Sequence, residues 1–473
     1  MFKTQPLHRS QAAGQFRPAR SVWLAGVALM WCALLVPTLA AAQTLSPGKL
    51  LDKDRQAFPT VPATRTGSLS PAVQSALTQA AVDLAGHRFP AAAVSAIGAS
   101  GDARMAWYLH DLLRLANDNQ LADLINAFEK LTGAELPTIP YAAMGNRLLA
   151  WNLPAPPGYR EMKRDVFLVI EPRWAPFFAD TASTIDWRHV GWGGVYIDDR
   201  PDATRGQNCP KGCIPALDQP KVTPASEGGW YPKDAIVFGI VVNGEARAYP
   251  KHIMEVHEMV NDTLGGRQIG IPYCTLCLSA QAYFTDTLPG FTPLLRTSGL
   301  LSRSNKLMYD VRSGSVIDTF TGIARSGPMR KAGVTLTQTT VVITSWGAWR
   351  AAHPKTTLLA QDGGIARAYP LNPLGGRDDR GPIFPVGDVD PRLPVHEVVL
   401  GVTSTQGQAL AFPRAAVQLA LAAGQPVRLG GVEVRSEAGG LRTFVDGKEV
   451  TSQQAFWFAW SQFKPGTLLW RRP

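Results

Sequence analysis

Two closely spaced pairs of cysteines are the residues best suited to chemistry. Cys209 and Cys213 stand in NCPKGCIP, Cys274 and Cys277 stand in YCTLC, and the fifth cysteine, Cys32, lies near the amino terminus. Four thiols are too few to stabilise a chain of 473 residues through a disulfide framework. Their close spacing in the sequence indicates local sites instead. A pair at such a spacing can form a reversible disulfide or bind a soft metal such as zinc or copper.

The pair Cys274 and Cys277 stands where a turn between strands can direct both sulfur atoms to one point. It follows the strand-like run RQIGIPY, and another apolar stretch comes after it. Backbone N–H groups in such a turn can stabilise thiolate charge. A thioredoxin-type module is not favoured, because it needs the first cysteine at the start of a helix in a βαβ unit. A redox pair, two soft-metal ligands and a static structural disulfide are the interpretations that remain.

The other pair, Cys209 and Cys213, lies in a loop that is rich in proline and glycine. The favoured interpretation is a structural disulfide that closes this loop. If the loop folds toward Cys274 and Cys277 instead, four thiolates can enclose one zinc or another soft ion. The spacing permits both arrangements.

The segment from Tyr249 to Asp262 predicts a helix that directs His257 toward the core. Pro250 suits a first helical turn, and the apolar side of the helix holds His257 together with Ile253, Val256 and Val260. Asn261 shares this direction four residues later, so the pattern resembles a His-Glu-x-x-His zinc helix whose second histidine is replaced. An amide oxygen is a poor zinc ligand, and a zinc peptidase is therefore not favoured.

Two interpretations of His257 stay open. It is either a buried histidine that hydrogen-bonds to a backbone or amide group, or a metal ligand or proton carrier that faces the cysteines and is oriented by Glu258 or Asn261. Under the second interpretation the candidate catalytic residues are Cys274, Cys277, His257, Glu258 and Asn261. The candidate ligands of a zinc or copper ion are Cys274, Cys277 and His257, with Cys209 and Cys213 as additional ones.

The amino terminus predicts export. Residues 1–20 contain four basic residues and no acid, residues 22–36 are apolar, and a run of alanines ending at Ala42 offers a cleavage site. The apolar run is about 15 residues long, shorter than the roughly 20 of a membrane-spanning helix, so an uncleaved anchor is the less favoured alternative. We expect a periplasmic or secreted protein with no stable membrane insertion after cleavage of the signal peptide.

The charge of the chain does not predict a nucleic-acid partner. The formal net charge of +10 falls to about +6 without the four basic residues of the leader. Basic and acidic residues are interspersed, whereas nucleic-acid-binding surfaces cluster lysine and arginine with aromatic residues. The expected partner is an unidentified small molecule or an envelope protein.

Helical spacing dominates the chain after the leader. Ser70 and Pro71 begin a helix that ends at Gly86, and further amphipathic segments run from the break at Gly101 to Gly133. Successive amphipathic helices with short polar breaks resemble a fragment of a HEAT-like array, although no strict period is found. This unit is expected to be a packing or docking platform.

Short strand-like runs bounded by turn residues replace the helical pattern from about residue 160. The runs are DVFLVI at 165–170, AIVFGIVV at 235–242 and RQIGIPY at 267–273. Polar and apolar residues alternate between Arg296 and Arg312, which predicts a hairpin with most of its polar side chains on a solvated face.

Two patterns recur in the same order and predict an internal duplication. IVFG at 236–239, leading to ARAYP, reappears as VVLG at 398–401, leading to ALAFP. WGAW at 346–349 reappears as WFAW at 457–460, and the proline, threonine and leucine that follow keep the same offset of 111 residues. The tryptophans are expected to pack in the core of both copies. Only the first copy contains the Cys/His segment, which lies between Pro250 and Trp346.

These motifs also carry a family resemblance. The ordered set YPKHIMEVHEMVND, YCTLC, SGLLSRSNKLMYD, FTG, the Trp-x-x-Trp segment and FWFAW resembles the bacterial domain-of-unknown-function family numbered 3179, over about residues 160–470. The resemblance implies export and a site at the cysteine pair, and it implies no established activity. Members usually show Cys-Pro-Leu-Cys-Gly where this chain has Cys274-Thr-Leu-Cys277-Leu. Members read Asp-Gly-Ile-Pro near residue 213, so Cys209 and Cys213 resemble a local addition.

Taken together, these patterns predict an α+β fold with a helical, HEAT-like unit followed by a β-rich, internally duplicated module. The expected divisions are a signal peptide (1–42), a linker (43–68), a helical domain (69–145), a connecting segment (146–230), repeat one with the Cys/His insert (231–360), a linker (361–396) and repeat two (397–473). The expected function is thiol redox chemistry or soft-metal binding, and the alternative is a non-catalytic envelope binding or scaffold protein with structural disulfides. The sequence leaves open whether the protein is an enzyme.

Overall fold

A computed structural model describes residues 58–136, 140–198, 200, 207, 209, 211–377 and 381–472. The predicted signal peptide, residues 1–42, and most of the predicted linker lie outside the described residues. All described residues belong to one compact unit. Helices come first in this unit and β-sheets form most of the rest, so the predicted α+β class is confirmed. None of its described helices is long and apolar enough to cross a membrane.

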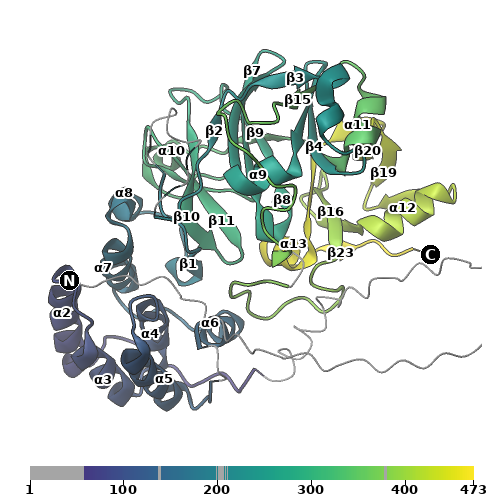
Figure 1. The fold of residues 1–473 in the computed structure, drawn as a ribbon. Coiled ribbons are helices and arrows are strands. Elements are labelled where there is room, and N and C mark those ends of the chain that lie inside the picture. Colours follow the sequence, from purple (N-terminus) through teal and green to yellow (C-terminus); the bar gives the residue numbers. More distant parts are fainter. Residues whose placement is uncertain are drawn as a thin grey trace, which may run out of the picture. The chain divides into compact units, whose positions relative to one another are not determined.

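The first part of the described chain is helical, and its helices pack side by side (Figure 1). The Ser70 hydroxyl accepts a hydrogen bond from Val73 N at 3.4 Å at the start of the first helix, and Asn117 and Gln120 form a capping box at the start of α5. The helices predicted from residue 70 and around residues 121–131 are confirmed. The helices are α2 (Pro71–Ala85), α3 (Ala91–Ser100), α4 (Ala106–Leu112), α5 (Asp118–Thr132), α6 (Pro140–Trp151), α7 (Tyr159–Ile170) and α8 (Ala175–Phe178).

The strand predicted at residues 165–170 is wrong, because these residues form the second half of α7. Tyr159, Lys163, Val166 and Phe167 recur at helical spacing and are all buried on one side of the helix. The apolar, partly β-branched run favours a strand locally, but packing of this face against α2 and α4 outweighs the local preference. The helical region therefore continues beyond residue 145, where the sequence placed its end.

Helix α7 brings a lysine into the interior of the helical region. The Lys163 side chain is 1% exposed, and its Nζ lies 2.8 Å from Oδ1 of Asp111 in α4. The Tyr159 hydroxyl donates to Oδ2 of Asp111 at 2.7 Å, and Lys163 donates to the Tyr159 oxygen at 3.1 Å. Burial lowers the pKa of Lys163 and raises the pKa of Asp111, and the opposite charge of the partner counteracts each shift. This buried ion pair joins α4 to α7.

A four-stranded antiparallel sheet, in the order β1-β10-β11-β12, packs against the helical region. Trp174 is fully buried, and its Nε1 donates to the Ser298 carbonyl of β10 at 2.8 Å. The predicted hairpin between Arg296 and Arg312 is confirmed as strands β10 and β11. The strands are β1 (Val190–Trp192), β10 (Leu295–Ser302), β11 (Asn305–Asp310) and β12 (Val316–Asp318).

The solvated face predicted for this hairpin is wrong, because most of its polar side chains are buried. Arg296 is 4% exposed and donates to both carboxylate oxygens of Asp218. Asp310 is 2% exposed and accepts hydrogen bonds from the backbone of Leu294 at 2.8 Å and of Ser313 at 2.9 Å. Alternating polar residues satisfied in this way can lie inside a protein, so alternation alone does not reveal which face meets water.

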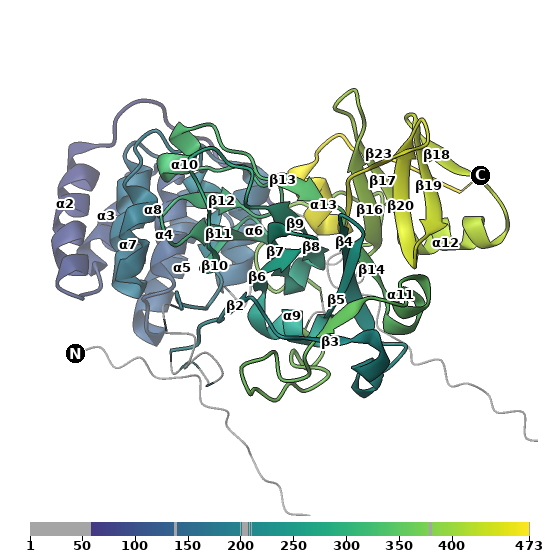
Figure 2. The same ribbon diagram turned by 90° about the horizontal axis from the view of Figure 1, so that it is seen from above.

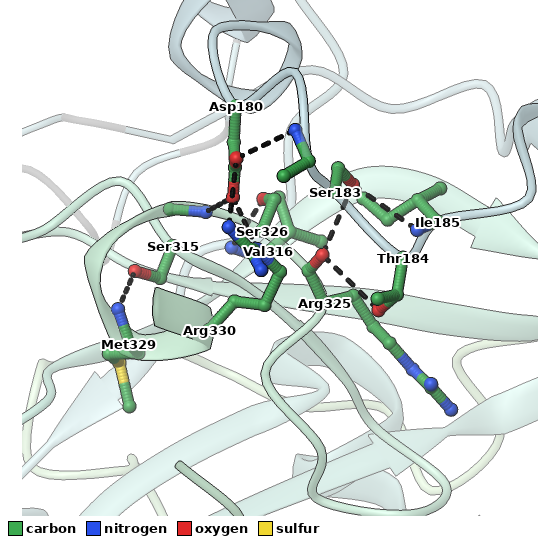
Figure 3. A network of polar contacts seen from close by, with 12 residues as sticks. Asp180, Ser183, Thr184, Ile185, Ser315, Val316, Arg325, Ser326, Met329 and Arg330 are labelled. Carbon is green, nitrogen blue, oxygen red and sulfur yellow. Dashed lines mark hydrogen bonds and ion pairs between the residues drawn. The ribbon is translucent and has the colours of Figure 1, made fainter. Parts of the chain in front are cut away.

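Asp180 connects the end of the helical region to α10 (Gly327–Lys331), as Figure 3 shows. Its Oδ2 lies 2.6 Å from Arg330 Nε and accepts from the Gly327 backbone at 2.9 Å, and its Oδ1 accepts from Arg330 Nη2 at 3.1 Å. Nearby, the Arg325 carbonyl accepts from Thr184 N at 2.9 Å. The hydrogen bonds from Arg330 are the main cause that lowers the pKa of Asp180 to about 2.

We expect replacement of Asp180 by asparagine to lower the melting temperature at neutral pH and to lose its effect in acid. A carboxylate whose folded-state pKa lies below its ordinary value stabilises the fold at pH values above that ordinary value, here 3.8, and stops doing so as the pH falls toward about 2. Melting curves of the native protein and Asp180→Asn between about pH 6 and pH 2 measure the gap. A gap that stays constant over this range would contradict the assigned role of the carboxylate.

The central sheet has the order β13-β9-β7-β6-β2, and the short strand β8 pairs with β7 outside this path. Strand β7 confirms the strand predicted at residues 267–273. It pairs antiparallel with β6 from Arg267 to Pro272, and β2 pairs in parallel with β6. The strands are β2 (Leu217–Asp218), β6 (Met259–Leu264), β7 (Arg267–Cys274), β8 (Ser279–Ala280), β9 (Ala282–Phe284) and β13 (Thr337–Thr339).

Two further sheets share one strand arrangement. In β14-β4-β5-β15-β3 and in β22-β16-β17-β23, the first three strands are antiparallel and the fourth pairs in parallel with the third. Strand β4 confirms the strand predicted at residues 235–242. The strands are β3 (Val222–Pro224), β4 (Ile236–Val242), β5 (Glu245–Pro250), β14 (Val342–Ser345), β15 (Thr357–Leu359), β16 (Val398–Thr403), β17 (Ala409–Pro413), β22 (Ser452–Phe456) and β23 (Leu468–Leu469).

The tryptophans of both sheets are buried, as predicted. Trp349 lies in α11 (Trp346–Ala352) and donates its Nε1 to Thr356 at 3.0 Å, and Trp460 lies in α13 (Trp457–Phe463) and donates to Thr467 at 3.0 Å. Gly401 allows the Trp460 ring to lie directly on β16, because a Cβ at this glycine would stand 2.1 Å from a ring carbon. These contacts fix α11 and α13 on their sheets.

A last antiparallel sheet packs around α12 (Arg414–Ala422), next to β16 and β17 (Figure 2). Its order is β18-β19-β20-β21. Val417 and Ala420 of α12 share an apolar core with Val427, Val432 and Val434. The strands are β18 (Val427–Leu429), β19 (Val432–Glu437), β20 (Gly440–Val445) and β21 (Lys448–Val450).

Candidate functional site

The two cysteines of YCTLC lie at the tip of a tight hairpin in the central sheet. Cys274 ends β7, the residues Thr275–Cys277 form one 3₁₀ turn, and the chain returns as β8, where Ser279 pairs with Cys274. Leu278 closes the turn with a φ of 48°, a backbone conformation that glycine adopts more readily. The predicted turn between strands is thus present.

Both thiols are reduced and contact one carbonyl oxygen. The sulfur of Cys277 lies 2.9 Å from Ser304 O and that of Cys274 lies 3.8 Å from the same atom. Cys277 is completely buried and Cys274 is 5% exposed. Burial, followed by a hydrogen bond with Cys274, raises the pKa of Cys277 well above its ordinary value. The two thiols therefore interact directly and differ in access to solvent.

Helix α13 and neighbouring residues cover this pair. Cys274 and Cys277 belong to one apolar cluster with Phe320 and with residues of α13 such as Trp457 and Trp460. Ser304 provides a polar link to the same helix, since its hydroxyl donates to Gln462 Oε1 at 2.9 Å. Gln462 in turn donates to the Val386 carbonyl at 2.7 Å. The cysteine turn is thus held between the central sheet and α13.

A buried lysine stands beside the thiols, and the sequence did not reveal it. Lys306 of β11 is 3% exposed, donates to the Glu258 carbonyl and to Thr297 Oγ1, and lies 3.6 Å from Glu258 Oε2. Burial lowers its pKa, and the negative charges of Glu258 and of the Cys274 thiolate oppose that shift. The sequence offers one signal for Lys306, which is its position within a strand-like run. The alternating pattern of that run, however, predicts a solvated face.

Glu258 reaches the site because the predicted helix stops early. Helix α9 (Lys251–His257) ends at His257, and Glu258 adopts a left-handed conformation with a φ of 52°. Its Oε1 accepts a hydrogen bond from Thr275 Oγ1 at 3.0 Å, inside the cysteine turn. The structure therefore brings Glu258 together with Cys274, Cys277 and Lys306.

His257 makes its identified contacts elsewhere. Its Nδ1 lies 2.7 Å from Pro215 O, and its Nε2 lies 2.6 Å from the Tyr369 hydroxyl. The side chain is completely buried, and its ring packs edge-on against the ring of Tyr369. Contacts with a carbonyl and a hydroxyl at the two ring nitrogens match the interpretation of a buried, satisfied histidine better than that of a ligand facing the cysteines.

Asn261 is not on the helix, which corrects the helical face predicted through residues 249–262. It lies in β6, opposite Gly270 of β7. Its amide nitrogen donates to Asp218 at 2.7 Å and to the Leu295 carbonyl at 3.1 Å, and its oxygen accepts from the Leu295 backbone at 3.0 Å. These contacts join β6 to β2 and β10, so Asn261 supports the sheets.

Cys209 and Cys213 form a disulfide with a Cα–Cα distance of 5.5 Å. The favoured interpretation of this pair is therefore present, and its sulfurs offer no thiolates for the alternative four-sulfur metal site. Among the described residues, no group of three or more His, Cys, Asp and Glu side chains is arranged to hold a metal ion.

Comparison with known proteins finds a family model that matches the segment containing the site. Residues 211–435 match the model of a family described as "Protein of unknown function (DUF3179)". The resemblance to this family is therefore confirmed over a segment that contains α9, the cysteine turn and the hairpin β10–β11. No curated protein and no solved structure matches the chain. The chemistry of the site has to be argued from its own geometry.

Proposed function

We propose that Cys274 and Cys277 form a thiol–disulfide redox site in an exported protein. The observation that carries this proposal is the contact of both reduced sulfurs with Ser304 O, beside the buried ammonium group of Lys306. Sulfurs that interact at this range can be joined by a disulfide after a small movement of the turn. A nearby cation favours the thiolate, which is the reactive form of cysteine.

Cys274 is the attacking thiol in this proposal, because it is the partly exposed one. Its thiolate attacks a substrate disulfide, the S–S bond breaks, a mixed disulfide forms, and the first substrate sulfur leaves as a thiolate that takes up a proton. Cys277 then loses its proton and attacks the sulfur of Cys274, which releases the second substrate thiol and leaves a Cys274–Cys277 disulfide. The substrate gains the two electrons and two protons that the cysteine pair loses.

Lys306 and Glu258 have complementary roles in this sequence. The ammonium group stabilises the thiolate of Cys274 before attack. The Glu258 carboxylate contributes to the raised pKa of Cys277, which keeps this second thiol protonated until the mixed disulfide has formed. Thr275 holds the carboxylate through its hydroxyl at 3.0 Å. Asymmetry between the two thiols sets the order of the steps.

The test is a redox titration of the full chain in glutathione buffers of increasing oxidation. Samples are quenched in acid, the free thiols are alkylated, and the peptide that contains both cysteines is weighed by mass spectrometry. We expect one two-electron transition to an internal disulfide at this peptide. Two cysteines that remain alkylatable under the most oxidising buffer would refute the redox proposal.

Replacement of Lys306 by methionine is expected to slow alkylation of Cys274 by iodoacetamide at pH 7 by roughly tenfold, or about 1.4 kcal/mol of activation free energy, because it removes the buried positive charge that interacts with Cys274. The rate is measured by mass spectrometry of the cysteine peptide, after a melting curve shows that the variant is folded. Lys331→Met, at an exposed lysine of α10, is the matched control and should keep the native rate. Equal rates in the two variants would remove Lys306 from the mechanism.

Export is part of the proposal. The Cys209–Cys213 disulfide supports it, because disulfides persist mainly in oxidising compartments. Together with the leader pattern of residues 1–42 it favours a periplasmic or secreted protein. In this proposal Cys274 and Cys277 change their oxidation state, whereas the Cys209–Cys213 disulfide stays intact.

We also propose that the β-rich part arose by duplication and that the helical region is a HEAT-like platform. Support for the duplication comes from the shared strand arrangement and from the matched contacts Trp349–Thr356 and Trp460–Thr467. Support for the platform comes from the successive packing of α2, α3 and α5. In this view the first copy kept the chemistry and the second covers it with α13.

Two other functions are distinguished by the same samples. Complete burial of Cys277 favours a non-catalytic envelope scaffold. In a scaffold both cysteines stay reduced in every buffer, and Cys274→Ser changes the stability of the protein without changing any redox activity. Binding of zinc or copper by Cys274 and Cys277 predicts stoichiometric metal in the purified protein. Elemental analysis, carried out beside the thiol mapping, separates both functions from the redox site.

A further inference from the structure

A segment without helix or strand, residues 384–396, takes part in covering the cysteine pair. It leads into strand β16, and we call it the strap. Its side chains Val386 and Val389 are each 2% exposed and belong to the apolar cluster that contains Cys274 and Cys277. The strap and α13 therefore share the task of keeping solvent away from the two thiols.

Helix α6 of the helical region holds the strap from one side. The side-chain oxygen of Asn146 accepts hydrogen bonds from the backbone of Val386 at 2.7 Å and of Gly387 at 2.9 Å. The strap also lies directly on the helix, because a Cβ at Gly387 would stand 2.7 Å from the Cβ of Leu149. One asparagine and one close backbone approach thus fix the strap on α6.

Helix α13 holds the strap from the other side. Gln462 donates its Nε2 to the Val386 carbonyl at 2.7 Å, and Trp457 donates its Nε1 to the Asp390 carbonyl at 2.9 Å. Gln462 also accepts from Ser304, whose carbonyl contacts both thiols. The backbone at Val386 is therefore bonded to α6 through its N–H group and to α13 through its C=O group.

The strap is the part of the cover that can move at the lower cost. Displacing α13 would expose Trp457 and Trp460, which are both fully buried against the strands of their sheet. Displacing the strap breaks a few hydrogen bonds and exposes valines, which bury less apolar surface than tryptophans. Local opening is drawn from segments with few buried apolar contacts, and a segment without regular secondary structure is of this kind.

We propose that the strap is a gate over Cys274 and that α6 holds this gate closed through Asn146. When the strap is displaced, the sulfur of Cys274 becomes accessible to a disulfide substrate, a consequence that rests on the proposed redox function. The closed gate keeps the thiol from reacting with other oxidants. The helical region thereby controls access to a site to which it contributes no cysteine.

The test is the rate at which iodoacetamide alkylates Cys274 in the full chain, followed by mass spectrometry of the cysteine peptide. We expect Asn146→Ala to raise this rate by roughly fivefold to thirtyfold, because two hydrogen bonds of ordinary strength to the strap are lost. Asn372→Ala is the matched control and should keep the native rate. It also removes an asparagine oxygen that accepts from a backbone N–H, that of Gly375 at 2.9 Å.

A second variant disturbs the gate from the strap itself. In Gly387→Ala the added Cβ meets Leu149 and the residue keeps a φ of 72°, which alanine adopts poorly, so alkylation of Cys274 should again be faster. Native alkylation rates in both Asn146→Ala and Gly387→Ala would overturn the gate.

Hydrogen exchange separates an opening of the strap from a general loss of stability. In Asn146→Ala we expect faster exchange in peptides of residues 384–396 and native exchange in strand β7. Equal acceleration in the strap and in β7 would also overturn the proposal. Alkylation requires no redox activity, so a failed glutathione titration would refute the redox site without refuting the gate.

Discussion

Replacing Cys274 by serine is expected to abolish thiol–disulfide exchange, whereas replacing Cys277 by serine should trap a mixed disulfide. Without Cys274 the sulfur of Cys277 is completely buried and its pKa is raised, so no competent nucleophile is left at the turn. Without Cys277 the first attack proceeds but nothing resolves the product. Loss of the nucleophile should reduce the exchange rate more than a hundredfold, to that of the uncatalysed background.

The measurement is incubation of each variant with oxidised glutathione, followed by intact mass determination. A mass increase of one glutathione in Cys277→Ser, and none in Cys274→Ser, is the expected pair of results. Thr275→Ser serves as the control within the same turn, because it keeps the hydroxyl that donates to Glu258. A glutathione adduct on Cys277 in the Cys274→Ser variant would reverse the assigned roles of the two thiols.

Replacing Lys163 by methionine is expected to lower the free energy of unfolding by about 3–5 kcal/mol. The change leaves the Asp111 carboxylate buried, with the Tyr159 hydroxyl as its remaining partner in the pair. Chemical denaturation followed by circular dichroism measures the change. Protonation of Asp111 can relieve part of the cost, so the loss should be smaller at acidic pH than at neutral pH.

Lys130→Met, at an exposed lysine of α5, is the matched control and should change the free energy by no more than about 0.5 kcal/mol. The double variant Asp111→Leu with Lys163→Met removes both charges and should recover much of the loss, because a buried apolar pair carries no desolvation cost. If the single variant Lys163→Met is as stable as the native protein, the ion pair does not hold α4 and α7 together.

The sequence correctly predicts those helices and strands that are bounded by strong capping or turn residues. Ser70 and Pro71 define the start of α2, and the apolar runs of β4 and β7 fall between clear turns. The pairing of Cys274 with Cys277 at one turn, and the disulfide of the Cys209 loop, also follow from spacing. All of these features depend on residues that are near one another along the chain.

Features that depend on distant contacts were not predictable in the same way. The run at residues 165–170 has strand-like composition, yet it is helical because Val166 and Phe167 pack into the helical region. Helix α9 stops at His257 because the next residues pair with β7, so a helical projection misplaced Asn261. The role of Lys306 could not be predicted, because its partners Glu258 and Thr297 become its neighbours only when β10 and β11 pack on the cysteine turn.

Ser304 gives the oxidation state of the cysteines a mechanical consequence. Its carbonyl accepts from both thiols, its hydroxyl is bonded to Gln462, and the preceding residue is Arg303. Formation of the Cys274–Cys277 disulfide removes both S–H donors at once and leaves a buried carbonyl without those partners. Oxidation therefore changes the contacts of the residue that links the cysteine turn to α13. Formation of a disulfide between the two sulfurs can thus alter the contacts of α13, a helix that contains no cysteine.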